Sequence, residues 1–163
     1  MKIDPLEIKQ KTISVNQYLN NISEPFRDKF LERKREYTLN GEAVEKLKKF
    51  VSKYFVVAFS AEWCKDCAAN IPILALLSET AGLEVRIFGG LKKDTLNPKN
   101  KWRIPPSPPE VETFNVNKIP HIIIFRTDGE EIGKIIEKPS DALTLEEEIL
   151  QIVSRDQNTI TTL

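Results

Sequence analysis

The only two cysteines of the chain, Cys64 and Cys67, lie three positions apart, where a run of buried-strand residues is predicted to lead into a helix. Cys64 would then occupy the helix N-terminus, where free N–H groups and the helix dipole favour an anion and lower the pKa of a thiol from about 8.5. Cys67 follows one helical turn later on the same face, close enough to close a disulfide. We therefore expect Cys64 to be a nucleophile and the more buried Cys67 to be its resolving thiol. Such a pair accepts or donates two electrons by thiol–disulfide exchange.

Length and composition exclude several classes of protein. The chain has 163 residues, of which 40% are hydrophobic and 29% are charged, which is typical of one globular domain with an appendage. Its 24 basic residues balance its 24 acidic residues, which argues against a nucleic-acid-binding protein. No apolar run approaches the roughly 20 residues that span a bilayer, and the charged N-terminus lacks the apolar segment of a secretion signal. Two cysteines make neither a disulfide-scaffolded secreted domain nor a four-cysteine zinc site. We expect a cytoplasmic protein that binds neither nucleic acid nor membrane.

The sequence around and beyond the cysteines predicts alternating strands and helices. A β-branched and aromatic run at 54–59 predicts a buried strand, and apolar residues at helical spacing predict a helix over 64–80 that ends at Gly82. A proline-rich loop at 91–110 follows, and Asp128-Gly129 predicts the turn of a hairpin. The remaining expected elements are strands at 83–88, 121–125 and 131–137 and helices at 110–114 and 144–154. Together they predict a small mixed sheet covered by helices.

Residues 1–49 are predicted to form short helices. Ser23 is suited to cap a helix whose first position is Pro25, and Asn40 is suited to cap a second one. Residues 13–19 fit either a helix or a short strand. We therefore divide the chain into a helical N-terminal extension that packs on the core at 1–49, a main domain at 50–155 and a C-terminal tail at 156–163.

Four features of the sequence resemble the thioredoxin family. The string Trp63-Cys64-Lys65-Asp66-Cys67 after a strand resembles the Trp-Cys-x-x-Cys site of that family. Pro72 matches the proline that kinks the family's active-site helix, and Ile119-Pro120 matches the cis-proline loop that faces the dithiol. Asp128-Gly129 matches the turn between the last two strands. The resemblance covers residues 50–155 and implies a three-layer α/β/α sandwich around a central mixed sheet of four or five strands.

The proline at position 120 also has a physical argument of its own. An X–Pro bond adopts the cis form at modest cost, and proline lacks the N–H that a strand interior needs. A trans proline at the start of a strand is the alternative interpretation, but beside a dithiol we expect the cis form. The resemblance implies that the backbone of Ile119 pairs with a substrate chain. Ile119 and Pro120 are therefore candidate substrate-binding residues.

The sequence departs from the family pattern around the cysteines. Lys65-Asp66 stands where thioredoxin typically has Gly-Pro, and we expect Asp66 to raise the pKa of Cys64 and Lys65 to lower it. Ala58 stands where thioredoxin has a buried aspartate, six residues before the first cysteine. Glu62 is a candidate substitute for that proton acceptor, although a solvated surface carboxylate is the simpler interpretation. The chain thus resembles a divergent thioredoxin-like protein more than thioredoxin itself.

Three further side chains each have more than one interpretation. Trp63 is expected both to shield the dithiol and to offer a flat docking surface. Trp102, in the proline-rich loop, can clasp a partner or form a structural cover. His121 can pack in the core or lie near the dithiol. Cys64, Cys67 and His121 are only three metal ligands, and zinc needs a fourth, so we expect no metal site.

The sequence therefore predicts a thiol–disulfide oxidoreductase that reduces protein disulfides through Cys64 and Cys67. An external thiol or reductase would return the electrons, no bound cofactor is implied, and the chain is expected to act as a monomer. The alternatives are glutaredoxin-like or disulfide-isomerase activity at the same site, or a redox-sensing protein that docks a partner through its N-terminal helices and its proline-rich loop. The residues expected to support the cysteines are Trp63, Lys65, Asp66, Glu62 and Pro72.

Overall fold

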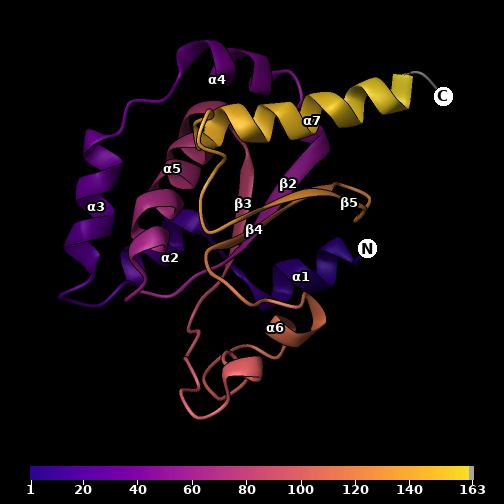
Figure 1. The fold of residues 1–163 in the computed structure, drawn as a ribbon. Helices are drawn as coiled ribbons and strands as arrows, with labels where there is room; N and C mark the ends of the chain where they lie inside the picture. The colour runs from indigo at the N-terminus through magenta and orange to yellow at the C-terminus, as the bar shows by residue number, and fades with distance from the viewer. Residues whose placement is uncertain (162–163) are drawn as a thin grey trace.

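The strands form one mixed sheet at the centre of the molecule. A computed structural model describes residues 1–161, and within them the sheet has five strands in the order β1-β3-β2-β4-β5 (Figure 1). β2 and β3 run parallel, whereas β1 is antiparallel to β3, β4 to β2, and β5 to β4. The strands are β1 (Ile13–Ser14), β2 (Tyr54–Phe59), β3 (Glu84–Phe88), β4 (His121–Arg126) and β5 (Glu131–Ile136).

Helices cover both faces of this sheet, which confirms the expected three-layer arrangement. Tyr54 of β2 points toward α7, whereas its neighbour Phe55 lies under Lys9 of α1, since successive strand residues face opposite sides. In Figure 1, α5 and α7 lie on one side of the sheet and α1 and α6 lie on the other. The helices are α1 (Pro5–Lys11), α2 (Val15–Asn21), α3 (Arg27–Glu36), α4 (Gly41–Lys48), α5 (Lys65–Ala81), α6 (Glu110–Thr113) and α7 (Leu145–Thr161), with short 3-10 turns at Val51–Lys53 and Pro98–Asn100.

The central strand β2 is buried along its whole length, as its unbroken apolar sequence predicts. Its aromatic residues pair with aromatic residues on both neighbouring strands. Phe59 stacks on Phe88 of β3 with ring centroids 4.7 Å apart, and Phe55 stacks on Phe125 of β4 at 5.4 Å. The same residues are direct partners in the strand register. The Phe59–Phe88 pair holds the end of β2 from which the cysteine-bearing turn begins, and the Phe55–Phe125 pair holds the strand near its other end.

The N-terminal segment differs in two ways from the sequence prediction. Residues 13–19 contain both of the alternatives, because the edge strand β1 is followed at once by α2. The helix expected from Pro25 begins instead at Arg27, and residues before it form a turn. The reason is that the Ser23 hydroxyl donates a hydrogen bond to the Glu62 carboxylate at 2.7 Å, so Ser23 does not cap the helix. The cap predicted at Asn40 is confirmed, since its side chain accepts a hydrogen bond from the N–H of Ala43.

The last helix begins as predicted but ends later. Thr144 and Glu147 form the expected capping box, with each side chain bonded to the backbone N–H of the other. α7 then continues past the predicted end at Ser154 to Thr161, so most of the segment 156–163 that was expected to be a tail is helical, and residues 162–163 lie outside the described residues. Within residues 1–161, no helix is long and apolar enough to cross a membrane.

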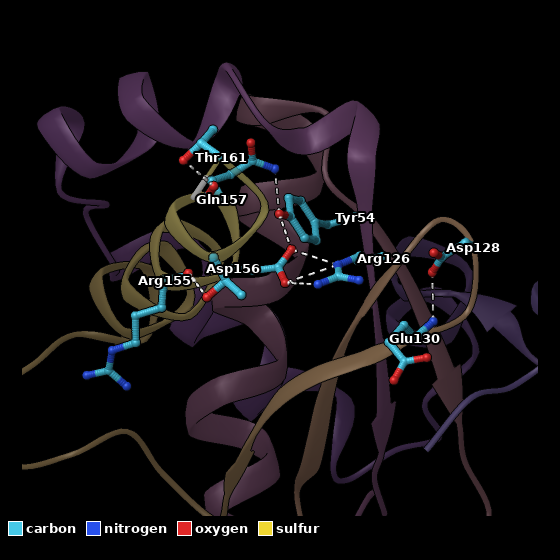
Figure 2. Close-up of polar contacts among 9 residues, drawn as sticks. Tyr54, Arg126, Asp128, Glu130, Arg155, Asp156, Gln157 and Thr161 are labelled. Carbon is cyan, nitrogen blue, oxygen red and sulfur yellow. Dashed lines mark hydrogen bonds and ion pairs between the residues drawn. The ribbon is translucent and has the colours of Figure 1, made fainter. Parts of the chain in front are cut away.

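The extra turns of α7 are anchored by a polar network that sequence periodicity does not reveal (Figure 2). The Asp156 carboxylate accepts hydrogen bonds from the Tyr54 hydroxyl at 2.6 Å and from the Arg126 guanidinium Nε at 2.9 Å. Gln157 in turn donates to the Tyr54 hydroxyl at 2.7 Å. The Asp156 side chain is almost fully buried, and the Arg126 hydrogen bonds are the main reason why the pKa of its carboxyl is below the ordinary value.

We expect Asp156→Asn to lower the free energy of unfolding by about 2 kcal/mol at pH 7, because it removes a charge-assisted bond and leaves Arg126 unpaired. A carboxyl whose pKa is lowered by folding stabilises the protein above its unfolded pKa of about 4, and this contribution is lost as pH falls through the folded pKa. Urea unfolding at several pH values should therefore show a smaller loss between pH 6 and pH 3 in the variant than in the unmodified chain. The exposed Asp141→Asn variant is the control, and equal pH slopes for all three proteins would contradict the prediction.

Candidate active site

The two cysteines lie at the turn where β2 leads into α5. Cys64 is the N-cap of α5, and its sulfur accepts a hydrogen bond from the backbone N–H of Cys67 at 3.2 Å. Both residues are free thiols. Cys64 is 9% exposed, whereas Cys67 is completely buried, which is the asymmetry expected of a nucleophile and a resolving thiol.

The surroundings of the two sulfurs move their pKa values in opposite directions. The pKa of Cys64 lies below its ordinary value, chiefly because the Cys67 thiol donates a hydrogen bond to it and because the N–H groups of Cys67 and Asp66 face its sulfur. Partial burial and the charge of Asp66 oppose this effect. The pKa of Cys67 is far above its ordinary value, mainly through burial and also because its proton is shared with Cys64. When the pair loses one proton, Cys64 therefore carries the negative charge and Cys67 keeps its proton.

The loop that carries Ile119 and Pro120 lies directly beside this pair. The Cys64 sulfur is 3.7 Å from the carbonyl oxygen of Ile119, and the Ile119–Pro120 peptide bond is cis. The backbone of Glu137 accepts a hydrogen bond from Asn70 of α5 at 3.1 Å and donates one to the carbonyl of Pro120 at 2.8 Å. Asn70 thus joins the cysteine-bearing helix to the proline loop through one intermediate residue. Sequence reasoning missed Asn70, because its partner is 67 residues away.

The two tryptophans lie against each other beside the dithiol. Trp63 precedes Cys64 and is 45% exposed, and one face of its ring stacks on Trp102 with centroids 5.8 Å apart. Trp102 is buried and its indole N–H donates to the carbonyl of Asn117 at 2.8 Å. The proline-rich loop is therefore packed against the site through Trp102, which corresponds to the structural cover rather than to a free clasp.

The charged residues expected to support the cysteines have different surroundings. Lys65 is exposed and Asp66 is half-buried. Glu62 is also half-buried, and its two carboxylate oxygens accept hydrogen bonds from the N–H and the hydroxyl of Ser23. Glu62 is thus not a simply solvated carboxylate, because both of its oxygens are bonded to Ser23. These bonds connect the cysteine-bearing turn to Ser23, which lies between α2 and α3.

Pro72 lies inside α5, two turns after Cys64, as the sequence analysis expected. Proline has no N–H for the carbonyl four residues before it, which opens the helix at that level. The neighbouring carbonyl of Ala69 accepts a hydrogen bond from the Arg33 side chain of α3 at 2.9 Å. α3 therefore supports the helix where its own hydrogen bonding is interrupted.

His121 packs in the protein core, edge-on against the ring of Phe59 at 5.9 Å. Burial, and secondarily the charge of Lys134, lower its pKa to about 4, so it is neutral at physiological pH. Among the residues that the structure describes, no three His, Cys, Asp or Glu side chains gather in a way that could hold a metal ion, and the trio Cys64, Cys67 and His121 makes no such group.

A buried pair of hydroxyl groups near Cys67 was also missed by sequence reasoning. The Ser60 hydroxyl, which is inaccessible to solvent, lies 2.9 Å from the hydroxyl of Tyr18 on α2. Position 58, where the thioredoxin pattern has an aspartate, is a fully buried alanine. The groups that act to lower the pKa of Cys67 are the Ser60 hydroxyl and the Ala61 N–H, and position 58 offers no carboxylate.

Comparison with known proteins identifies the family. The family model described as Thioredoxin matches residues 12–151, and the chain therefore belongs to the thioredoxin family. The match begins at residue 12 and therefore includes β1. This agrees with the position of β1 in the sheet.

Similar proteins are found both among curated sequences and among solved structures. The chain is 34% identical over 102 residues to a thiol:disulfide interchange protein TxlA homolog from Synechocystis, an alignment that covers 62% of this chain and 50% of the relative. The chain thus spans about half the length of that relative. A Pseudomonas aeruginosa protein of unknown function has a similar fold, with a TM-score of 0.69, 12% identity and coverage of 96% of this chain and 99% of the other. An HIV epitope-scaffold has a TM-score of 0.70, 13% identity and coverage of 94% and 99%.

We expect the rate of Cys64 alkylation by iodoacetamide to reach half its maximum below the pH of about 8.5 that is usual for cysteine. Asp66→Asn should shift this midpoint further down, by a few tenths of a pH unit to about one unit, because the Asp66 charge opposes the Cys64 thiolate. Asp141→Asn, which changes an exposed carboxylate in a different part of the chain, should leave the midpoint unchanged. An upward shift in the Asp66 variant would show that its backbone position, and not its charge, governs Cys64.

Proposed function

We propose that this protein is a thiol–disulfide oxidoreductase that reduces protein disulfides through Cys64 and Cys67. The observation that carries the proposal is the unequal environment of two adjacent sulfurs. Cys64 lies at a helix N-terminus with the N–H of Cys67 3.2 Å from its sulfur, while Cys67 is completely buried behind it. Membership of the thioredoxin family and the similarity to a protein named for thiol:disulfide interchange support the same class of reaction.

The reaction has two exchange steps. The Cys64 thiolate attacks one sulfur of the substrate disulfide, a Cys64–substrate disulfide forms, and the second substrate sulfur leaves as a thiolate. Cys67 then loses its proton and attacks the Cys64 sulfur, so that the Cys64–Cys67 disulfide forms and the first substrate sulfur leaves. The substrate gains two electrons and the dithiol loses them, while the protons that the two cysteines release and that the substrate thiolates take up pass through the solvent. An external thiol or a reductase returns the protein to the dithiol form.

The surroundings of Cys64 favour an extended chain as the substrate. The Ile119 carbonyl lies beside the attacking sulfur, so a disulfide that reaches Cys64 also reaches the backbone of that loop. Trp63, the residue before Cys64, offers a half-exposed ring. Both features fit a protein disulfide that is held by backbone pairing and by contact with an apolar surface.

Two other functions would use the same two cysteines. The electron donor and the reduction potential distinguish them from the proposed reductase. A glutaredoxin-like protein is reduced by glutathione, and an isomerase or oxidant has a high reduction potential. A cytoplasmic reductase, by contrast, has a low potential and is reduced by a dedicated reductase or dithiol. A redox-sensing adaptor would form the disulfide reversibly without turning over a substrate.

We expect the unmodified chain to reduce insulin disulfides, and Cys64→Ser to lower the turnover by at least about a hundredfold, because the nucleophile is lost. Cys67→Ser should instead accumulate a mixed disulfide between Cys64 and the substrate, visible as a covalent adduct on a non-reducing gel. Cys64→Ser, incubated in the same way, is the control and should form no adduct. If the two single variants behave alike, the assigned roles are wrong.

A redox titration of the unmodified chain against a dithiothreitol couple tests the direction of the reaction. A low potential supports the reductase, and a high potential favours an oxidant or isomerase. If no reversible Cys64–Cys67 disulfide forms, the catalytic proposal fails and the partner-binding alternative takes its place.

A further inference from the structure

In the second exchange step Cys67 must lose its proton, and its buried surroundings oppose this. Cys67 must become a thiolate to attack Cys64, yet it is completely buried, and burial disfavours the charged form of a thiol. The position at which a carboxylate could accept its proton is occupied by Ala58. The nearby carboxylate of Glu62 is held by two hydrogen bonds from Ser23. Stabilisation of the Cys67 thiolate must therefore come from other groups.

Ser60 is well placed to supply it. It directly follows β2, and its N–H donates to the carbonyl of Phe88 at 3.0 Å, which continues the pairing of the two strands and fixes the backbone of Ser60. The side chain is inaccessible to solvent. The Ser60 hydroxyl and the Ala61 N–H both act to lower the pKa of Cys67, against the larger effect of burial.

Tyr18 completes the arrangement from a distant part of the chain. Its hydroxyl lies 2.9 Å from the Ser60 hydroxyl, across 42 residues of sequence. The ring is held by close packing, because a side chain at Gly89 would approach its Cε1 atom to 2.9 Å, and the edge of Phe30 contacts it at 6.3 Å between centroids. Burial raises the pKa of the Tyr18 hydroxyl, so it keeps its proton, and either hydroxyl of the pair can donate to the other.

We propose that Tyr18 and Ser60 form a two-hydroxyl donor chain that stabilises the Cys67 thiolate during resolution of the mixed disulfide. Tyr18 donates to the Ser60 oxygen, and Ser60 donates to the Cys67 sulfur as negative charge develops there. Cys67 releases its proton to the solvent as it ionises and the substrate sulfur departs as a thiolate, so both hydroxyls keep their own protons. Ser60 acts on a reacting atom, whereas Tyr18 is a positioning residue that acts through Ser60. This inference rests on the proposed function.

The aromatic disulfide 5,5′-dithiobis(2-nitrobenzoate) separates the two steps. Attack by Cys64 releases one coloured thiolate in a phase whose rate is proportional to the reagent concentration. Attack by Cys67 on the resulting mixed disulfide releases a second coloured thiolate in a phase whose rate does not depend on that concentration. Stopped-flow absorbance therefore reports the Cys67 step by itself.

We expect Ser60→Ala to slow the second phase about tenfold or more, the effect of removing one hydrogen bond to a charged group, and to leave the first phase unchanged. Tyr18→Phe, which keeps the ring and its packing, should slow the second phase a few-fold. The double variant should be no slower than Ser60→Ala alone, because Tyr18 acts through Ser60. Tyr37→Phe is the matched control, since it removes another tyrosine hydroxyl, one that donates to Glu146, and should change neither phase.

The pH dependence of the second phase distinguishes a hydrogen-bond role from a packing role. Its midpoint should rise by about one unit in Ser60→Ala, the equivalent of a tenfold change, and less in Tyr18→Phe. Apart from Tyr18 itself, the titratable groups that act on Cys67 or on Tyr18 are Cys64 and Glu62, and both variants retain them.

An unchanged second phase in both single variants would overturn the inference, as would a Tyr18→Phe effect that is equally large with and without Ser60. A slower second phase without a shift of its pH midpoint would show that Tyr18 and Ser60 act only through packing, and this would also overturn the inference. If the unmodified chain releases only one thiolate, the proposed function itself fails. Should Ser60→Ala not fold, the phase rates and midpoint of Tyr18→Phe still decide the question.

Discussion

The hydrogen bond from the backbone of Cys67 to the sulfur of Cys64 is the interaction on which the site depends. It forms only if Cys64 is placed at the first turn of α5, where the N–H groups of a helix have no partners of their own. The buried strand β2 sets that position, because the stacking of its last residue, Phe59, on Phe88 of β3 fixes the point at which the chain leaves the sheet. The proline loop is then held at the same sulfur through Asn70 and the backbone of Glu137.

The N-terminal segment helps to position the cysteine-bearing turn. β1 pairs with the outer edge of β3, and the Arg86 side chain donates to the carbonyls of Lys9 and Thr12, which fastens the segment to the sheet. α2 supplies Tyr18 to the inside of the cysteine turn, and Ser23 holds Glu62 on the outside. The turn between β2 and α5 is therefore hydrogen-bonded to two residues of the N-terminal segment, Tyr18 and Ser23.

Local patterns were enough to predict the elements that carry the chemistry, and they failed where a contact crosses the fold. The buried run of β2, the cysteine spacing and the capping box at Thr144 each depend on neighbours within one or two turns, so the sequence displays them directly. The Ser60–Tyr18 pair joins residues 42 positions apart, and a serine next to a strand has no periodicity that points to a partner. The extra turns of α7 were missed for the same reason, since Asp156 is held by Tyr54 and Arg126.

Hydroxyl groups in place of a buried carboxylate spare the site the free-energy cost of burying a second charged group beside Cys67. A carboxylate beside Cys67 would have to be kept out of water throughout the cycle, and an unpaired buried charge is expensive unless it takes up a proton. Two hydroxyls joined by a hydrogen bond at 2.9 Å are neutral, so no buried charge has to be held while Cys67 is a thiol or part of a disulfide. Their donor capacity is called on only when the sulfur becomes negative, which is the moment of attack on Cys64. The alanine at position 58 is then consistent with a site that favours the Cys67 thiolate by hydrogen bonding alone, without a charged base in the core.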